Sequence, residues 1–206
     1  FVENAAHELQ TPLAVCMNKL ELLSEHPDCT EDQLKEIAGL HQALNGIIRL
    51  NKSLLLLSRI DNKQFPETRD ICLNHLIHKI LEGINDIYER KALHLRVSEK
   101  ESLVCTMNES LATTLITNLI KNAYVHNYEK GDIGITISRR MLTIANTGID
   151  KTLDKELLFA RFASQSKQQE STGLGLAIVK SIVDLYSIRI DYQYANGMHT
   201  FTLLFY

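Results

Sequence analysis

The sequence lacks three features that would place it quickly in a large class of proteins. Its four cysteines, at 16, 29, 72 and 105, form no CxxC pair and no metal-type spacing with histidine, which predicts ordinary reduced thiols. Its 22 basic and 25 acidic residues give a formal charge of −3, so no basic excess points toward a nucleic acid partner. No apolar run approaches the roughly 20 residues that a bilayer crossing needs. We therefore expect any membrane attachment to lie in segments absent from this chain.

The length and composition favour one or two globular domains. The chain has 206 residues, of which 45% are apolar, enough for a substantial core. It starts at Phe1 inside a helical pattern, and we expect it to be a piece of a longer protein.

The first sixty residues have the periodicity of two long helices. Apolar residues recur three and four apart in 1–25 and again in 30–60, and Thr30 is the expected N-cap of the second helix. A hairpin with so broad an apolar face cannot bury it alone, which predicts a dimeric four-helix bundle. His41 and Asn51 interrupt the apolar stripe, and we expect them to set helix register in the bundle.

The first helix also carries a candidate nucleophile, His7, in the heptapeptide His-Glu-Leu-Gln-Thr-Pro-Leu. Thr11 lies one turn further on the same helical face, whereas Glu8 lies about 100° round the helix. A neutral imidazole is a competent nucleophile, and its ordinary pKa of about 6.5 leaves it mostly neutral at cellular pH. Most exposed helical histidines are plain surface residues, so the heptapeptide alone leaves both interpretations open.

A second domain is expected after an aperiodic linker at 61–66 that ends in proline, which gives domains 1–62 and 67–206. Strands and helices segregate rather than alternate, which favours an α+β sandwich over a doubly wound sheet. The expected strands are 71–73, 93–97, 103–105, 133–137, 141–145, 188–194 and 200–205, and the expected helices are 74–91, 108–127 and 172–186. We expect the first of these helices to be capped by Asn74 and to bury Leu76, Ile80, Ile84 and Ile87.

Three polar segments of the second domain have side chains suited to a nucleotide. Asn118 and Asn122, four apart on one helix, offer amide oxygens of the kind that Mg²⁺ accepts. Asn146, in a turn Asn-Thr-Gly after a strand, could accept a hydrogen bond from an adenine amino group. The segment 171–177 brings glycines to a helix N-terminus, where main-chain amides favour phosphate. The plain structural alternatives are surface asparagines, a simple turn and close helix packing.

In this order the segments resemble the catalytic core of the bacterial sensor histidine kinases of two-component signalling. Five boxes over essentially the whole chain carry the resemblance: the H box His7–Leu13, the N box Asn118–Ala123, the first glycine box Asn146–Gly148, the F box Leu158–Phe162 and the second glycine box Thr172–Lys180.

The resemblance implies a dimerisation and phosphotransfer hairpin followed by a Bergerat-type ATP-binding domain, an α/β sandwich. It implies that His7 accepts the γ-phosphoryl group of ATP and that Glu8 orients or deprotonates the imidazole. Thr11 would position water when the same core dephosphorylates its partner regulator. The implied partners are a second copy of the chain, bound through the hairpin, and a receiver domain that takes the phosphoryl group on an aspartate. The chain would be the cytoplasmic portion of a membrane-bound sensor.

The resemblance also implies ATP and Mg²⁺ as cofactors, with Asn118 and Asn122 holding the metal and the phosphates. Residues 149–171 would form an ATP lid that Phe159 and Phe162 pack against the domain. The residues implied to contact the nucleotide are Asn118, Lys121, Asn122, Asn146, Gly148, Phe159, Thr172, Gly173, Leu174, Gly175 and Leu176.

Four positions depart from the family pattern. Asn146 stands where aspartate is usual, which removes a charge-assisted acceptor and predicts weaker ATP binding. Val125 stands at a frequent lysine position, Ser171 at a frequent glycine and Gln10 at a frequent basic residue. Two alternatives stay open. An ATPase of the same sandwich fold would leave His7 without a purpose, and a dimeric scaffold that has lost ATP chemistry would fit Asn146 and Val125.

Overall fold

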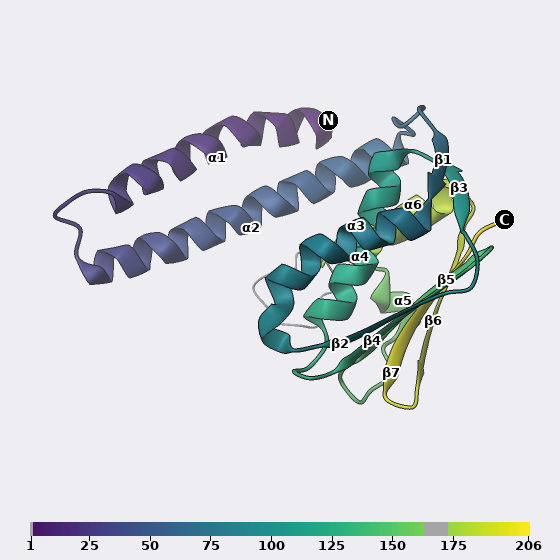
Figure 1. The fold of residues 1–206 in the computed structure, drawn as a ribbon. Helices are drawn as coiled ribbons and strands as arrows, with labels where there is room; N and C mark the ends of the chain where they lie inside the picture. Colours follow the sequence, from purple (N-terminus) through teal and green to yellow (C-terminus); the bar gives the residue numbers. More distant parts are fainter. Residues whose placement is uncertain (1, 163–172) are drawn as a thin grey trace.

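The chain folds into a helical hairpin followed by an α/β domain, as the sequence predicts (Figure 1). The computed structural model describes residues 2–162 and 173–206, with side chains from residue 8 onward. The hairpin consists of the antiparallel helices α1 (Val2–Ser24) and α2 (Glu31–Asp61).

Thr30 caps α2 through a reciprocal pair of hydrogen bonds. The Thr30 hydroxyl accepts from the main-chain N–H of Gln33, and the Gln33 side chain accepts from the N–H of Thr30. This capping box satisfies two N–H groups at the start of the helix that would otherwise have no partner in it. The predicted N-cap is confirmed.

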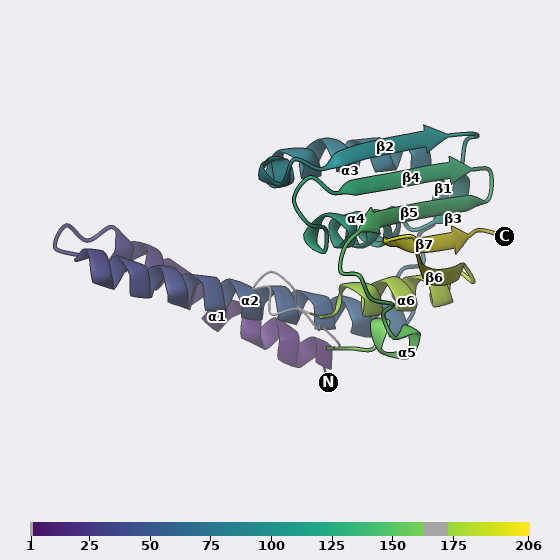
Figure 2. The ribbon, with the colours of Figure 1, turned by 90° about the horizontal axis from the view of Figure 1, so that it is seen from below.

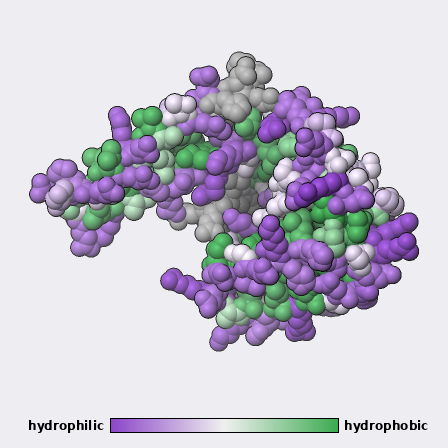
Figure 3. All heavy atoms as spheres, turned by 45° about the horizontal axis from the view of Figure 1, so that its top comes forward, coloured by the Kyte–Doolittle hydropathy of each residue, from purple (hydrophilic) through white to green (hydrophobic). Residues whose placement is uncertain are grey.

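One face of the hairpin leaves apolar side chains open to solvent, interspersed with charged ones (Figure 3). Its exposed large hydrophobic residues are Leu9, Val15, Leu22, Leu23, Leu34, Leu40 and Ile47. By contrast, Asn51 in the second half of α2 is buried. Across 2–162 and 173–206, no helix is both long enough and apolar enough to cross a bilayer.

The α/β domain has a five-stranded sheet in the order β2-β4-β5-β7-β6, and helices α3, α4 and α6 lie over one of its faces (Figure 2). Strands β2 and β4 are parallel and the other neighbours are antiparallel, while β1 and β3 form a separate antiparallel pair. The elements are β1 (Arg69–Cys72), α3 (Leu73–Tyr88), the 3-10 helix η1 (Glu89–Lys91), β2 (His94–Glu99), β3 (Val104–Met107), α4 (Glu109–Val125), β4 (Asp132–Ser138), β5 (Met141–Thr147), α5 (Lys155–Leu158), α6 (Gly175–Leu185), β6 (Arg189–Ala195) and β7 (Met198–Leu204).

Helix α3 corrects two predictions. The helix begins at Leu73 rather than after Asn74, and Asn74 is buried, accepts from the main-chain N–H of Leu103 at 2.9 Å and donates to the Glu99 carboxylate at 2.6 Å. Of the expected inner face, Ile84 is buried and Leu76 and Ile80 pack against the core, whereas the prediction for Ile87 is wrong, since Ile87 is 72% exposed. The residues of α3 that are buried are Leu73, Asn74, Ile77, Leu81 and Ile84. The helix has two neighbouring apolar stripes, and its contact with β1 and α4 decides which one is buried.

The end of α2 belongs to the core of the α/β domain. Leu57 and Ile60 are almost completely buried in the same cluster as residues of α4, α6 and the sheet. At the last residue of α2, the Asp61 carboxylate pairs with the Arg161 guanidinium at 2.9 Å. The linker predicted at 61–66 therefore follows a helix that already packs on the domain it was expected to lead to.

Candidate functional site

The N box and the second glycine box meet where α4 passes the start of α6. The Asn118 amide nitrogen donates to the Thr114 carbonyl at 2.8 Å, which fixes the orientation of the carboxamide. A Cβ atom on Gly175 would lie only 2.9 Å from Asn118 Oδ1. The amide oxygen of α4 and the N-terminal end of α6 thus adjoin, and this combination suits a metal ion with phosphate oxygens.

The three residues of α4 that were predicted to contact the nucleotide lie on its half-buried side. Asn118, Lys121 and Asn122 are all half-buried, whereas the leucines beside them at 111, 115 and 119 have no exposed surface. The prediction that Leu111, Leu115 and Leu119 lie on the buried face of α4 is therefore confirmed.

The first glycine box lies beside the C-terminal end of α4. Asn146 is 2% exposed and lies within β5, so the prediction that it occupies a turn after the strand is wrong. Its amide nitrogen donates to the Thr147 carbonyl at 2.8 Å, which leaves Oδ1 to act as the acceptor for an adenine amino group. A Cβ atom on Gly148 would be 3.0 Å from the His126 carbonyl oxygen and 3.0 Å from the His199 ring. The chain can pass between these groups only because residue 148 has no side chain.

Lys91 supports the C-terminal end of α4, and sequence reasoning missed it. Its Nζ atom donates to the main-chain carbonyls of Tyr124, Val125 and Asn127 at 2.9, 2.8 and 3.0 Å. The last carbonyls of a helix carry partial negative charge, so a cation here is stabilising. Burial, reinforced by the positive charge of Lys91, lowers the pKa of His126 at the same helix end. These partners lie more than thirty residues from Lys91, and no local pattern in the sequence indicates them.

A main-chain hydrogen bond links the F box to the start of the second glycine box. Phe159 packs on the core, edge-on to Phe201 with 6.5 Å between ring centroids. Phe162 is 58% exposed, so the prediction that it also packs against the domain is wrong. Its N–H donates to the Gly173 carbonyl at 3.1 Å. Residues 163–172 lie outside the described part of the chain, and with them the predicted site residue Thr172 and the second part of the predicted lid, 163–171.

The second glycine box starts its helix later than predicted. Gly173 has a φ of 68°, a left-handed conformation that favours glycine, and α6 begins at Gly175 rather than near Thr172. Leu174 has no exposed surface, so its side chain belongs to the core, and only its main chain can reach a nucleotide. Leu176 is half-buried and packs against the same core.

The structure does not bring the H box to this pocket. His7 lies in α1, and Glu8 and Thr11 are exposed on the same helix. The amino-terminal end of α1 and helix α5, which follows β5, lie well apart (Figure 1). In this arrangement the start of α1 and the site where α4 meets α6 are separate parts of the molecule.

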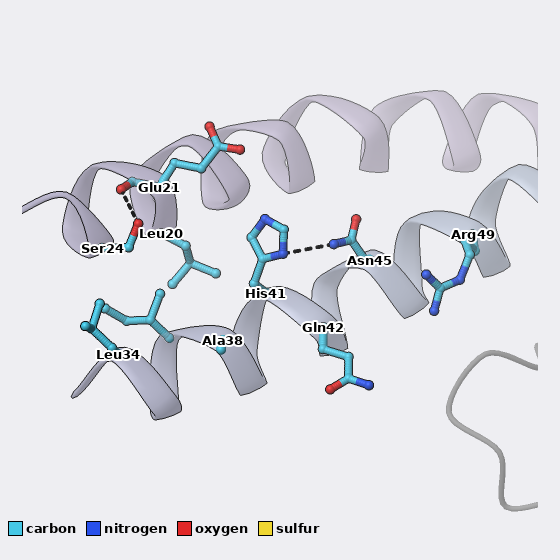
Figure 4. Close-up of a pocket in the computed structure, with 10 residues that line it drawn as sticks. Leu20, Glu21, Ser24, Leu34, Ala38, His41, Gln42, Asn45 and Arg49 are labelled. Atoms are coloured by element: carbon cyan, nitrogen blue, oxygen red, sulfur yellow. Dashed lines mark hydrogen bonds between the residues drawn. The ribbon is translucent and has the colours of Figure 1, made fainter. Parts of the chain in front are cut away.

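The hairpin has an open groove of about 530 Å³ near its tip, between α1 and α2 (Figure 4). His41 lies in it, with Nδ1 3.0 Å from the amide nitrogen of Asn45. The lining residues are Leu20, Glu21, Ser24, Leu34, Ile37, Ala38, His41, Gln42, Asn45 and Arg49. The groove has the mixed character of a helix-bundle seam and is remote from the glycine boxes. In the described ranges, no three His, Cys, Asp or Glu residues are grouped so as to hold a metal ion.

Comparison with known proteins gives two family matches in series. Residues 1–63 match the His Kinase A (phospho-acceptor) domain, and residues 107–205 match the histidine kinase-, DNA gyrase B-, and HSP90-like ATPase family. The chain is 34% identical over 215 residues to the heme sensor protein HssS of Staphylococcus saprophyticus and 33% identical over 212 residues to that of Staphylococcus aureus. These alignments take in 100% and 98% of this chain but 46% of each relative, so the chain spans less than half of their length.

Solved structures with the same architecture support the fold. Full-length ShkA in complex with AMPPNP superposes with a TM-score of 0.76 at 16% identity, covering 100% of this chain and 46% of that one. The Acinetobacter baumannii histidine kinase AdeS superposes with a TM-score of 0.66 at 21% identity, covering 96% and 95%. Identities this low speak for the arrangement of helices and strands alone.

Proposed function

Because the chain belongs to the two-component sensor histidine kinases, we propose that it is the ATP-dependent kinase core of such a sensor. It transfers the γ-phosphoryl group of ATP to His7 and then to an aspartate of a response-regulator receiver domain. The same core removes the phosphoryl group from that regulator, with Thr11 positioning the water. The observation that carries this proposal is the contact of Asn118 with Gly175, which unites two predicted nucleotide-binding segments 57 positions apart in the sequence.

The residues present fit a magnesium-bound triphosphate. Asn118 and Asn122 would hold the metal and the phosphates through amide oxygens, and the orientation of the Asn118 carboxamide, with its nitrogen bound to Thr114, leaves Oδ1 for this task. When bound, Mg²⁺ neutralises charge on the transferred group. The main-chain N–H groups at the start of α6 face the phosphates, and Asn146 reads the adenine amino group.

In the proposed reaction the protein aligns groups and moves one proton. An imidazole nitrogen of His7 forms a bond to the γ-phosphorus in line with the departing oxygen of ADP, whose bond to phosphorus breaks. The product is a phosphoramidate, and Glu8 takes the proton that the imidazole loses. Since the start of α1 and helix α5 lie apart in Figure 1, we expect the ATP-binding domain to move before transfer and this motion to limit turnover.

The remaining assignments concern partners and location. The exposed apolar face of the hairpin supports a homodimer in which two hairpins form a four-helix bundle. The receiver domain would dock on the same bundle, close to His7. We place the chain on the cytoplasmic side of a membrane-bound sensor, attached through segments outside this sequence. The net charge of −3 gives no reason to include a nucleic acid.

A labelling experiment tests the function. The chain is incubated with γ-labelled ATP and Mg²⁺, with His7→Gln as the test variant and His26→Gln as the matched control, since His26 is an exposed histidine of the same hairpin. A kinase gains acid-labile, alkali-stable label that is lost in His7→Gln and kept in His26→Gln. Release of phosphate without labelling would instead support an ATPase of the same fold. Absence of both would support a scaffold.

A further inference from the structure

A buried histidine of β7 lies beside the proposed adenine end of the pocket. His199 is 5% exposed and pairs directly with Asn146 across β5 and β7. Side chains of such a cross-strand pair project from the same face of the sheet. The ring of His199 also lies against Gly148, because a Cβ atom there would be 3.0 Å from Cδ2 and 3.3 Å from Nε2.

Both ring nitrogens of His199 are engaged, and their partners fix the tautomer. Nε2 lies 2.8 Å from the carbonyl oxygen of Ile149, which can only accept, so Nε2 carries a proton. Nδ1 lies 2.8 Å from the hydroxyl of Tyr192, and that hydroxyl accepts from the main-chain N–H of Leu153 at 3.2 Å. The Tyr192 hydroxyl therefore donates its own proton to Nδ1.

This chain of hydrogen bonds holds the segment that follows the first glycine box. Ile149 is bound directly by His199, and Leu153 is bound through Tyr192. Between them, Asp150 accepts a hydrogen bond from the hydroxyl of Tyr194, whose ring centroid is 4.8 Å from that of His199. The main chain from 148 to 153 is thus tied to β6 and β7 by aromatic side chains grouped around a single imidazole.

We propose that His199 is a positioning residue of the nucleotide pocket. It fixes the main chain at Gly148 and Ile149, and so the wall of the pocket beside Asn146. The inference rests on the proposed function, because it assigns His199 to the adenine end of the site that Asn146 and Gly148 form. An imidazole suits this position because it donates from one side, accepts on the other and fills the space against a residue without a side chain.

The test compares three changes around His199 with one control. His199→Leu removes both hydrogen bonds of the ring. Tyr192→Phe removes the hydroxyl that links Nδ1 to Leu153 and keeps the bond of Nε2 to Ile149. His199→Gln restores a donor toward Ile149. Tyr124→Phe is the matched control, since it also removes a half-buried hydroxyl bond, to Asn85, away from this segment. Binding of MgATP is measured by calorimetry, the rate of His7 phosphorylation at saturating ATP by labelling, and protection of the 149–153 amides by hydrogen exchange.

We expect His199→Leu to weaken MgATP binding about tenfold and Tyr192→Phe about threefold, with His199→Gln between wild type and His199→Leu. The rate at saturating ATP should stay within about twofold, because the transferred phosphoryl group lies at the other end of the nucleotide. Amide protection should fall in the first two variants and stay unchanged in Tyr124→Phe. A variant that only loosens the fold would lower binding and rate together.

Three results would overturn the inference, and only the last would also overturn the proposed function. If the wild-type chain binds MgATP and His199→Leu binds it equally well, the positioning role is wrong while the proposed function stands. The same holds if the 149–153 amides keep their protection in His199→Leu. If the wild-type chain does not bind MgATP, the proposed function fails and the role of His199 toward a nucleotide fails with it.

Discussion

Asn118 of α4 and Gly175 of α6 lie so close that a methyl group on residue 175 would come within 2.9 Å of Asn118 Oδ1. The atom in the way is the end of a rotatable side chain, so Gly175→Ala should leave the fold intact and turn the Asn118 carboxamide away. We expect MgATP affinity to fall about tenfold, with Tm within about 2 °C of wild type. Calorimetry and thermal unfolding measure the two effects.

Gly83→Ala is the matched control for this change. Gly83 lies inside α3 with nothing within 4 Å of the added Cβ atom, so alanine there should stabilise the protein by about 0.5–1 kcal/mol and leave ATP binding unchanged. Normal MgATP binding by Gly175→Ala would show that Asn118 does not need its present orientation.

Replacing Asn146 by aspartate should change affinity and stability in opposite directions. A carboxylate accepts more strongly from the adenine amino group, so ATP binding should tighten by about threefold to tenfold. The carboxylate cannot donate to the Thr147 carbonyl as the amide does, so the free energy of unfolding of the nucleotide-free protein should fall by about 1–3 kcal/mol. Calorimetry and unfolding without nucleotide test the pair of effects, with Asn85→Asp as a control that keeps its acceptor role toward Tyr124. Tighter binding without any loss of stability would contradict this account of the amide.

The ion pair of Asp61 with Arg161 should slow the motion that transfer requires, since it ties the F box to the end of α2. Both side chains are about half exposed, so the pair is worth about 0.2–1 kcal/mol. Asp61→Arg should therefore raise the rate of His7 phosphorylation by up to about fivefold. Added salt should reduce the difference in rate between the variant and the wild type, because it screens the charges. The double variant with Arg161→Asp restores the pair and should return the rate to wild type. If the double variant is as fast as Asp61→Arg, the ion pair does not limit the rate of phosphorylation.

Charges on the open face of the hairpin should disrupt the proposed dimer. Leu40 and Ile47 are 55% and 48% exposed and seven residues apart on α2, the spacing of a bundle seam. Burial of such a side chain contributes about 1.5–3 kcal/mol, so Leu40→Lys with Ile47→Lys should give monomers in light scattering. Ile87→Lys, on the exposed side of α3, is the control and should not change the mass. A dimer that survives the double change must use another surface.

Removal of the Lys91 ammonium should loosen the end of α4. Lys91→Met loses hydrogen bonds to three carbonyls. It should lower the free energy of unfolding by about 2 kcal/mol and the Tm by roughly 4–8 °C. Lys91 also helps to lower the pKa of His126, so that pKa should rise toward its ordinary value in the variant, as an NMR titration would show. Lys79→Met, an exposed lysine of α3, should do neither. An unchanged His126 titration would mean that burial alone sets its pKa.

The sequence predicted those parts of the site that follow from local spacing. Thr30 caps α2 as predicted, and the last two expected strands are present as β6 and β7, joined by a turn in which Asn196 and Gly197 have positive φ. Local patterns could not choose between adjacent apolar stripes of α3, because that choice depends on packing against other elements. Lys91 and His199 were missed for a related reason, since their partners come from distant parts of the chain.

The continuity of α2 has a mechanical consequence. One end of this helix forms the tip of the hairpin, and its other end, at Leu57 and Ile60, shares a hydrophobic core with α6. Helix α6 in turn begins at the glycine that touches Asn118. A rotation of the hairpin would therefore be transmitted through α2 to α6, whose first residue lies at the proposed phosphate site. We therefore expect that a stimulus can regulate the kinase core by rotating helix α2, without a change in any residue proposed to bind ATP.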